Sequence, residues 1–325
     1  MNQLNDKIKI LFIPFLIIAV GCIGGYTFIH WLLFIHWNIF PIEDNILEIL
    51  FPALVPIFPI YYWWQPRVNL ISENEGSLVY FNASFANGNR WRKGNPRMGI
   101  QFFAILTIAT STIIAQFYLE TATGKITNLE NVTQISQQKA TKYYSLDSCY
   151  IDKKDNGKNI YATVSGKYSD GLEYSMYLVM PIFNKATDTI QPTSNVWLGI
   201  KYGRRISNRI SQVEKDEQWR KFIRDCANNL FMKNMHEFVY LERVGNNNDH
   251  DIYISALRKS CKGSGGDNII LLPINKPFEA RNGHKFVWIF GSFAIGLVIL
   301  FIILQYLKFD EIDLENYKKS RNKVY

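Results

Sequence analysis

Residues Ile10–Trp31 read ILFIPFLIIAVGCIGGYTFIHW, and this stretch decides the fold class. It contains no Asp, Glu, Lys or Arg and is long enough to cross a lipid bilayer as one helix. A cleaved signal peptide would be followed by a small-residue cleavage site and a polar start. Phe34 and Trp37 follow instead. The stretch therefore predicts a retained membrane-spanning helix.

Three further apolar stretches, at 47–64, 100–119 and 286–307, also predict membrane spans. Prolines interrupt the first of them, which ends in an aromatic cluster typical of the lipid headgroup region (Pro52, Pro56, Pro59; Tyr61, Tyr62, Trp63, Trp64). Such prolines indicate either a broken helix that lines a transport site or a kinked anchor. None of the four spans has an Asp, Glu, Lys or Arg at its centre, which favours the kinked anchor.

The overall composition conceals these spans. The chain is 48% hydrophobic with a mean hydropathy of -0.07, because long polar segments offset the apolar ones. An aromatic content of 15% with only four cysteines excludes a disordered chain and a disulfide scaffold. The net charge of +8 is common in nucleic-acid-binding proteins. Much of it flanks the spans, so we expect the lipid bilayer as partner and no nucleic acid.

The basic residues of the short segments beside the spans all fall on one side of the membrane if both termini are cytoplasmic. They lie before the first span, between the second and third, and after the fourth (Lys7, Lys9; Arg67, Arg90, Arg92, Lys93, Arg97; Lys308, Lys318, Lys319, Arg321, Lys323). The only Asp, Glu, Lys or Arg residues in the segment between the first two spans are Glu43 and Asp44. This asymmetry predicts that both termini lie in the cytoplasm. The predicted domains are three transmembrane helices with a basic cytoplasmic loop (1–119, loop 65–98), an extracytoplasmic domain (120–284), a fourth transmembrane helix (285–307) and a basic cytoplasmic tail (308–325).

The segment 120–284 predicts an α+β domain of its own. A polar lead at 121–140 precedes strand-like segments at 141–151 and 160–168, which flank Asn156-Gly157 as in a hairpin. Strands are also expected at 172–182, 196–201, 238–244 and 269–274, with a helix at 252–259. From Ser211 a helical apolar stripe begins, and Ser211 with Glu214 forms a capping box (Trp219, Phe222, Ile223, Cys226, Leu230). The fold class is an α-helical membrane protein with an inserted α+β extracytoplasmic domain.

Two sets of residues are candidate interaction sites. Small residues four apart allow close helix packing, within the chain or with a partner (Gly21 and Gly25; Ser292 and Gly296). A positive patch suits lipid headgroups or an acidic ligand, although such a run is more often plain solvated surface (Lys201, Arg204, Arg205, Arg209). We expect neither a metal site nor a cofactor.

A polar run and the cysteines can each be interpreted as a functional site or as ordinary structure. The run Asn246–Asp251 offers cation ligands, but a polar turn in which Asp249 or Asp251 caps the next helix is favoured. Cys226 lies on the apolar stripe and is expected in the core. A disulfide between Cys149 and Cys261 is possible in an oxidising compartment, and the sequence does not establish it.

Four short stretches point to a family. They are YLETATGK, FVYLERVGN, KPFEARNG and WIFGSFAIG, starting at Tyr118, Phe238, Lys276 and Trp288. They resemble the amino-terminal extension of a group of bacterial rhomboid-family intramembrane proteases, in which such a module precedes the rhomboid core. The resemblance covers the chain up to about Glu311. It implies a bacterial plasma membrane, and a rhomboid-type protease core or another membrane protein as partner.

The resemblance does not supply a catalytic site. Rhomboid catalysis requires a serine in a Gly-x-Ser-Gly element and a histidine on another membrane helix. No serine here has a glycine two residues before it, since Ser292 follows Gly291 directly. The chain stops where the core would begin, so we expect a stand-alone relative of the extension or a truncated product. We expect a non-catalytic membrane protein that presents a binding or regulatory domain. The alternatives are the substrate-recognition part of a rhomboid-type protease and an envelope or small-molecule sensor.

Overall fold

The chain folds into two compact units, each described here by itself. The computed structural model describes residues 2–37, 42–72, 96–190, 194–260 and 268–322. The helical unit comprises Met1–Thr123 and Asn282–Tyr325, and the sheet unit comprises Gly124–Arg281. Parts of the predicted basic loop, including Arg90, Arg92 and Lys93, lie outside the described residues.

Among the described residues, four helical stretches are long and apolar enough to cross a membrane: Gln3–His36, Ile46–Val68, Pro96–Thr123 and Phe278–Tyr306. Each predicted span lies inside one of them, apart from Leu307 at the end of the fourth. The first stretch consists of α1 (Asn2–Lys7), η1 (Ile8–Phe12), α2 (Ile13–His30) and η2 (Trp31–His36). The third is α6 (Pro96–Thr123), and the fourth consists of η6 (Phe278–Asn282) and α10 (Lys285–Tyr306).

The second stretch is helical in short pieces. It runs through η3 (Ile46–Leu50), α3 (Phe51–Leu54), α4 (Ile57–Pro59), η4 (Ile60–Trp64) and α5 (Gln65–Val68). Pro52 lies in the first turn of α3 and Pro56 caps α4, where a missing backbone N–H is tolerated. Pro52 and Pro59 are buried. The prolines therefore divide the helix without ending it.

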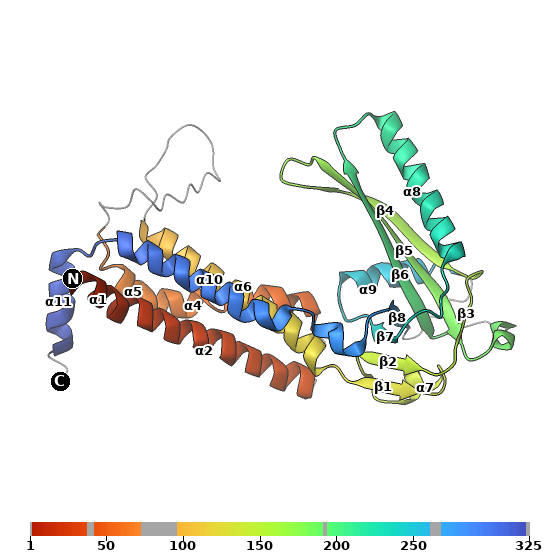
Figure 1. The fold of residues 1–325 in the computed structure, drawn as a ribbon, viewed down its shortest axis with the longest axis horizontal. Helices are drawn as coiled ribbons and strands as arrows, with labels where there is room; N and C mark the ends of the chain where they lie inside the picture. Colours follow the sequence, from red (N-terminus) through yellow and green to blue (C-terminus); the bar gives the residue numbers. More distant parts are fainter. Residues whose placement is uncertain (1, 38–41, 73–95, 191–193, 261–267, 323–325) are drawn as a thin grey trace. The chain divides into compact units, whose positions relative to one another are not determined.

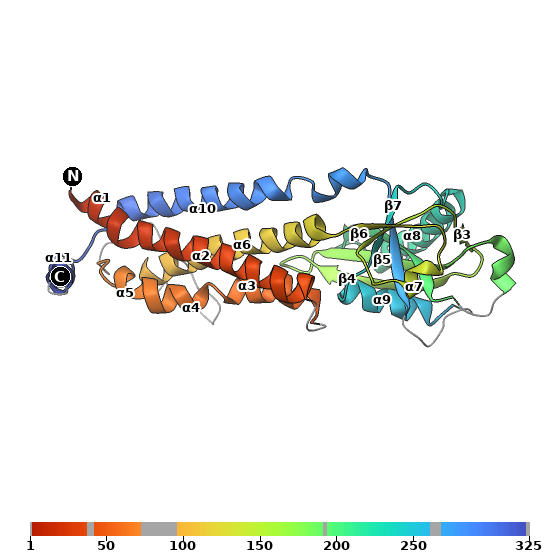
Figure 2. The same ribbon diagram turned by 90° about the horizontal axis from the view of Figure 1, so that it is seen from below.

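Helices α2, α6 and α10 lie side by side, as Figure 2 shows. Their shared core contains Phe15, Trp64, Ile100 and Leu300. The indole Nε1 of Trp64 donates a hydrogen bond to the Leu11 carbonyl at 2.9 Å. Where α6 meets α10, Gly296 lies directly against the Thr107 side chain, and the hydroxyls of Ser111 and Ser292 are 3.1 Å apart.

Backbone hydrogen bonds join the segment after the second stretch to the segment after the fourth. Ile71 and Phe309 form an antiparallel bridge, with Ser72 N donating to Lys308 O and Asp310 N to Leu70 O. The Arg97 guanidinium donates to the Ile71 carbonyl at 2.9 and 2.7 Å. We call this arrangement the terminal bridge. It is followed by α11 (Glu311–Asn322), a helix that was not expected in the tail.

The sheet unit is built on one mixed sheet. Its strand order is β1-β2-β7-β8-β6-β5-β3, with β4 also paired to β5. The pairs β1–β2 and β6–β8 are parallel and the others antiparallel. The strands are β1 (Ile126–Leu129), β2 (Tyr143–Leu146), β3 (Tyr150–Ile151), β4 (Gly157–Ser165), β5 (Gly171–Phe183), β6 (Val196–Ser207), β7 (Tyr240–Arg243) and β8 (Ile269–Ile274).

Strand β5 is buried on both faces, because a helix packs on each side of it (Figure 1). Helix α8 (Gln212–Met232) covers the even-numbered side chains of β5, such as Met176 and Met180, with Phe222 and Cys226. Helix α9 (Asn248–Leu257) covers Tyr177 and Val179 on the other face. The short helices α7 (Gln134–Gln137) and η5 (Ala186–Ile190) lie in connections.

The structure confirms some sequence predictions and corrects others. The strand at 172–182, the apolar stripe of α8 and the capping box of Ser211 and Glu214 are present. The predicted hairpin across Asn156-Gly157 is wrong, because β3 and β4 both pair with β5 rather than with each other. The polar lead contains β1 and α7. Helix α9 begins earlier than expected and is capped by Asn247, not by Asp249 or Asp251.

The contact at Gly296 predicts a packing defect on substitution. A Cβ at this position would lie 2.2 Å from Thr107 Cγ2, and a β-branched side chain has little rotamer freedom in a helix. We expect Gly296→Ala to destabilise the protein by about 1–3 kcal/mol, as overpacking does. Thermal unfolding of the detergent-solubilised chain would measure this. In the matched control Gly21→Ala, the new Cβ meets nothing within 4 Å. The control should be neutral or slightly stabilising, and equal losses in both variants would contradict the prediction.

Candidate functional site

The predicted anion-binding patch is divided between different surfaces. Side chains of a strand alternate between its two faces, and Lys201, Arg204 and Arg205 all belong to β6. Lys201 contacts α9 on one face, and Arg204 contacts α8 on the other. Arg209 lies beyond β6, in the turn before α8. The four cations therefore do not form one site, which corrects the expectation from their closeness in sequence.

Lys201 belongs to a cluster of titratable side chains at the start of α9. The Tyr177 hydroxyl donates to Asp249 Oδ1 at 2.5 Å, and Lys201 Nζ is 3.2 Å from both Asp249 oxygens. Lys201 Nζ also lies 4.8 Å from the centre of the Tyr177 ring, which stacks on Tyr161. Burial, and then the hydrogen bond to Asp249, raise the pKa of Tyr177. The cluster therefore keeps the proton on Tyr177 and fastens α9 to the sheet.

Arg204 has a similar role on the opposite face. Its Nη2 is 2.7 Å from Asp225 Oδ2 on α8, and its guanidinium lies over the Phe222 ring. The hydrogen bond from Arg204 lowers the pKa of Asp225. The pair is partly exposed, so solvent screens it and its contribution to stability is small. The pair of Arg204 and Asp225 joins α8 to β6 at a defined position.

The helix-packing candidates differ from each other. Ser292 and Gly296 lie against α6 within the chain. Gly21 and Gly25, with the same spacing, are exposed on α2, and a Cβ at either position would contact nothing within 4 Å. Spacing alone therefore does not reveal which small residues are used for packing inside the chain.

A buried polar contact joins α2 to α6, and sequence reasoning missed it. His30 is 6% exposed, and its Nδ1 is 2.6 Å from Gln116 Oε1. The amide Nε2 of Gln116 donates to Thr27 Oγ1 at 3.1 Å and to the Thr112 carbonyl at 3.0 Å. Because the amide nitrogen is the donor in both bonds, the amide oxygen accepts from His30. Gln116 within an apolar span was the available signal, since a buried amide needs partners.

The serine and the histidines of the helical unit do not form a catalytic pair. Ser292 Oγ contacts Ser111 Oγ and the Ile289 carbonyl, whereas the bonded partner of His30 is Gln116. A serine nucleophile needs a base within hydrogen-bond distance. Across the ranges that the structure describes, no serine hydroxyl is hydrogen-bonded to a histidine ring.

The remaining candidates have structural positions. In the run Asn246–Asp251, the Asn247 side chain accepts from His250 N and caps α9, and Asp249 belongs to the Tyr177 cluster. The described residues contain no group of three metal-ligating side chains. Cys226 is 3% exposed in the core, and burial raises the pKa of both the Cys226 and Cys149 thiols, which are free. Cys261, the other half of the suggested disulfide, lies outside the described residues.

A polar hollow of about 320 Å³ lies beside the ends of β5 and β6. Its lining combines apolar side chains with hydroxyl, amide and carboxylate groups (Val132, Thr133, Ser136, Ile182, Phe183, Asn184, Asp188, Ser194, Asn195, Val196). The Asn184 side-chain oxygen accepts from Val132 N, and Ser194 Oγ donates to the Val196 carbonyl at 2.9 Å. The Asp188 carboxylate accepts from Lys185 N at 3.1 Å, so these polar groups of the lining are already hydrogen-bonded within the chain.

Comparisons with protein-family models, curated proteins and solved structures gave no match to this chain. A functional proposal therefore depends on the residues and geometry described above.

The Tyr177 cluster predicts a pH-dependent effect of one hydroxyl. We expect Tyr177→Phe to reduce the free energy of unfolding by about 1–2 kcal/mol, because the variant loses a hydrogen bond to a carboxylate. The pKa of Tyr177 is raised in the folded protein above an unfolded value of about 10. The stabilisation by the Tyr177 hydroxyl is therefore complete below about pH 10. It decreases as the pH rises further, because Tyr177 of the unfolded chain loses its proton at a lower pH than Tyr177 of the folded protein.

The measurement is thermal or denaturant unfolding of the full chain at several pH values. Tyr168→Phe is the control, because Tyr168 is 74% exposed and has no hydrogen bond among the described residues. An equal effect of both substitutions, or a loss that grows above pH 10, would refute the assigned role of Tyr177.

Proposed function

We propose that this chain is a multi-pass membrane protein that presents the sheet unit outside the cytoplasm, as a binding or regulatory domain without catalytic residues of its own. One observation carries the membrane assignment. Large apolar side chains are exposed along the four apolar helical stretches, although the helices pack against one another (Ile17, Val20, Phe28, Leu54, Phe58, Phe102, Leu106, Val287, Phe290, Val298). Lipid chains would cover such a surface, whereas exposing it to water is unfavourable.

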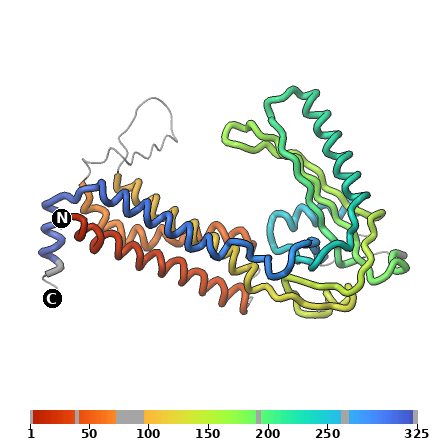
Figure 3. Tube along the Cα trace, viewed as in Figure 1, coloured from red at the N-terminus to blue at the C-terminus, as the bar shows by residue number. Residues whose placement is uncertain are grey.

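The positions of the termini support the proposed orientation. The first and last described helices, α1 and α11, lie at the same end of the helical unit (Figure 1 and Figure 3), where Lys318 Nζ is 2.7 Å from Asp6 Oδ2. The basic residues Lys7, Arg97 and Lys308 belong to this end of the stretches. By the positive-inside rule it is the cytoplasmic end, and the family resemblance supports a bacterial plasma membrane.

The properties of the sheet unit support a binding rather than a catalytic role. Two of its polar pairs, Tyr177 with Asp249 and Arg204 with Asp225, join helices to the sheet. The hollow beside β5 and β6 offers hydroxyl, amide and carboxylate groups next to apolar side chains, a lining suited to recognition of a polar ligand or a chain segment.

Reporter fusions test the orientation. Alkaline phosphatase, which folds only outside the cytoplasm, should be active when fused after Asp170 and inactive when fused after Arg92. Green fluorescent protein at the same two positions should give the opposite result and serves as the control. Activity only after Arg92 would invert the topology, and equal activity at both positions would remove the membrane assignment.

We also propose, from the sequence resemblance, that the sheet unit is a regulatory or substrate-recognition module for a rhomboid-type protease. Capture of the native protein from its own membranes, followed by intact-mass measurement, tests this second role. The expected result is a stoichiometric rhomboid partner, or a product heavier than the 37.8 kDa of this chain. A mass of 37.8 kDa with no protease attached would contradict the role and leave the membrane assignment unaffected.

A further inference from the structure

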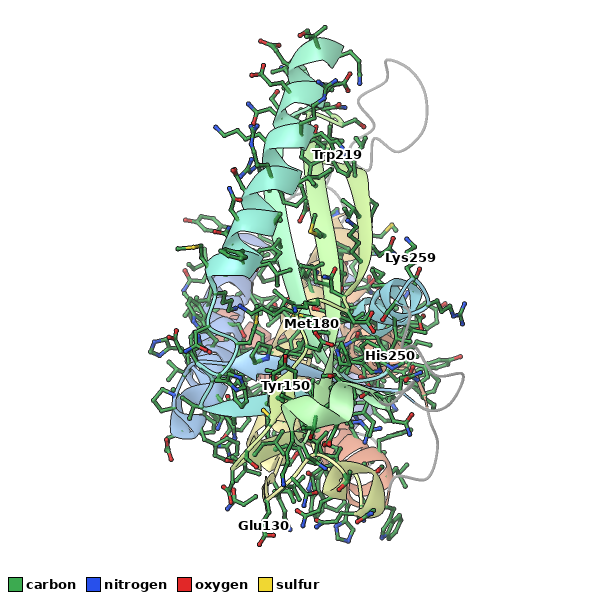
Figure 4. All side chains as sticks on the ribbon, turned by 90° about the vertical axis from the view of Figure 1, so that its right-hand side faces the viewer. Glu130, Tyr150, Met180, Trp219, His250 and Lys259 are labelled. Atoms are coloured by element: carbon green, nitrogen blue, oxygen red, sulfur yellow. The ribbon has the colours of Figure 1, made fainter. Side chains whose placement is uncertain are left out.

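From Arg220 onward, the solvent-facing side of α8 carries basic side chains and ends in two exposed apolar side chains. Arg220, Lys221 and Arg224 follow one another around the solvent side of the helix, opposite the buried Phe222 and Cys226. In the last turn, Phe231 is 82% exposed and Met232 is 79% exposed. Figure 4 shows nitrogen-tipped side chains on the side of α8 away from the strands.

The loop between β3 and β4 extends this face. Lys153 Nζ donates to the carbonyls of Phe231 and Lys233 at 3.4 and 2.5 Å, at the carbonyl end of α8. A cation is favourable there because the helix dipole is negative at that end. Lys153 therefore lies at the end of α8 next to Phe231, and Lys154 and Lys233 directly follow Lys153 and Met232 in the sequence.

The acidic side chains of this region are engaged elsewhere. Asp225 pairs with Arg204, Asp155 accepts from Ser260 Oγ at 2.9 Å, and Glu237 accepts from the Asn234 amide. Glu217 lies at the upstream margin of the face. Within the described ranges, the six cations of the face form no ion pair (Lys153, Lys154, Arg220, Lys221, Arg224, Lys233). Asp225 also interacts electrostatically with Lys221 and Arg224, and Glu217 adds one carboxylate, so the six cations leave the face with a reduced but net positive charge.

We propose that these six cations, with Phe231 and Met232, form a surface that binds the anionic headgroups of a lipid bilayer. We call it the α8 basic face. The cations attract anionic lipid, and the two apolar side chains enter the boundary between headgroups and acyl chains. This inference rests on the proposed membrane function, because α6 and α10 then hold the sheet unit beside the bilayer at high effective concentration.

The shape and chemistry of the face favour a lipid surface over an acidic protein segment. An extended segment usually adds to a sheet edge, and a helical one enters an apolar groove. The α8 basic face is the outside of a helix, with cations along it and apolar side chains at its end. Such an arrangement suits a broad charged surface with an apolar interior.

Hydrogen–deuterium exchange of the full-length chain in lipid nanodiscs tests the proposal. One set of discs contains phosphatidylcholine alone, and the other contains equal parts of phosphatidylcholine and phosphatidylglycerol. We expect the backbone amides of 228–235 to exchange roughly tenfold more slowly in the anionic discs. The protection should decrease in about 1 M salt, where the screening length is about 3 Å.

Two variants and a matched control identify the residues responsible. The triple variant Arg220→Glu, Lys221→Glu, Arg224→Glu should lose the protection, and so should Phe231→Ser with Met232→Ser. The control Lys139→Glu, Lys185→Glu, Arg258→Glu changes the charge equally at exposed positions elsewhere on the sheet unit and should keep it. The serine variant removes only exposed apolar groups, so it remains informative if the charge variant unfolds.

Three results would overturn the proposal: equal exchange in both kinds of disc, loss of protection in the control variant, or protection by soluble polyglutamate in neutral discs. The last would assign the face to an acidic protein partner. Failure of the chain to enter nanodiscs at all would instead overturn the proposed membrane function, so the two failures are distinguishable.

Discussion

A helix that is apolar on every side forms its own backbone hydrogen bonds, but it cannot bury all of its side chains against a few neighbouring helices. This constraint determines the structure of the helical unit. Helices α6 and α10 approach closely where small or hydroxyl-bearing residues allow it, at Gly296 with Thr107 and at Ser111 with Ser292. A second polar contact, between His30 and Gln116, joins α2 to α6. These contacts fix specific neighbours, while the surrounding apolar surface needs a non-aqueous environment.

The sheet unit, in contrast, buries most of its apolar side chains within itself. Strand β5 has hydrogen-bonded neighbours on both edges and a helix on each face, so most of its side chains are buried within the unit. Polar pairs then define where the helices lie, with Arg204 and Asp225 for α8 and Tyr177 and Asp249 for α9. The core of this unit needs no lipid, which suits a domain that works in water beside a membrane.

Features set by local sequence could be predicted, and features set by distant partners could not. The four apolar stretches, the alternation along 172–182 and the capping box of Ser211 depend on neighbours in sequence. The pairing of β3 and β4 with β5 depends on residues far along the chain, so Asn156-Gly157 gave a false hairpin signal. The cations of β6 illustrate the same limit. Closeness in sequence suggested one patch, whereas alternation divides Lys201 from Arg204. The cations of α8 and of the β3–β4 loop come together only in the folded unit.

The terminal bridge has a mechanical consequence. Two backbone hydrogen bonds and the Arg97 guanidinium join the segment before α11, the segment after α5 and the first turns of α6 at one point. A pull on α11 along the chain would load these hydrogen bonds together with the covalent link to α10. Tension on the C-terminal helix is therefore shared between α10, the segment after α5 and, through the Arg97 guanidinium, α6.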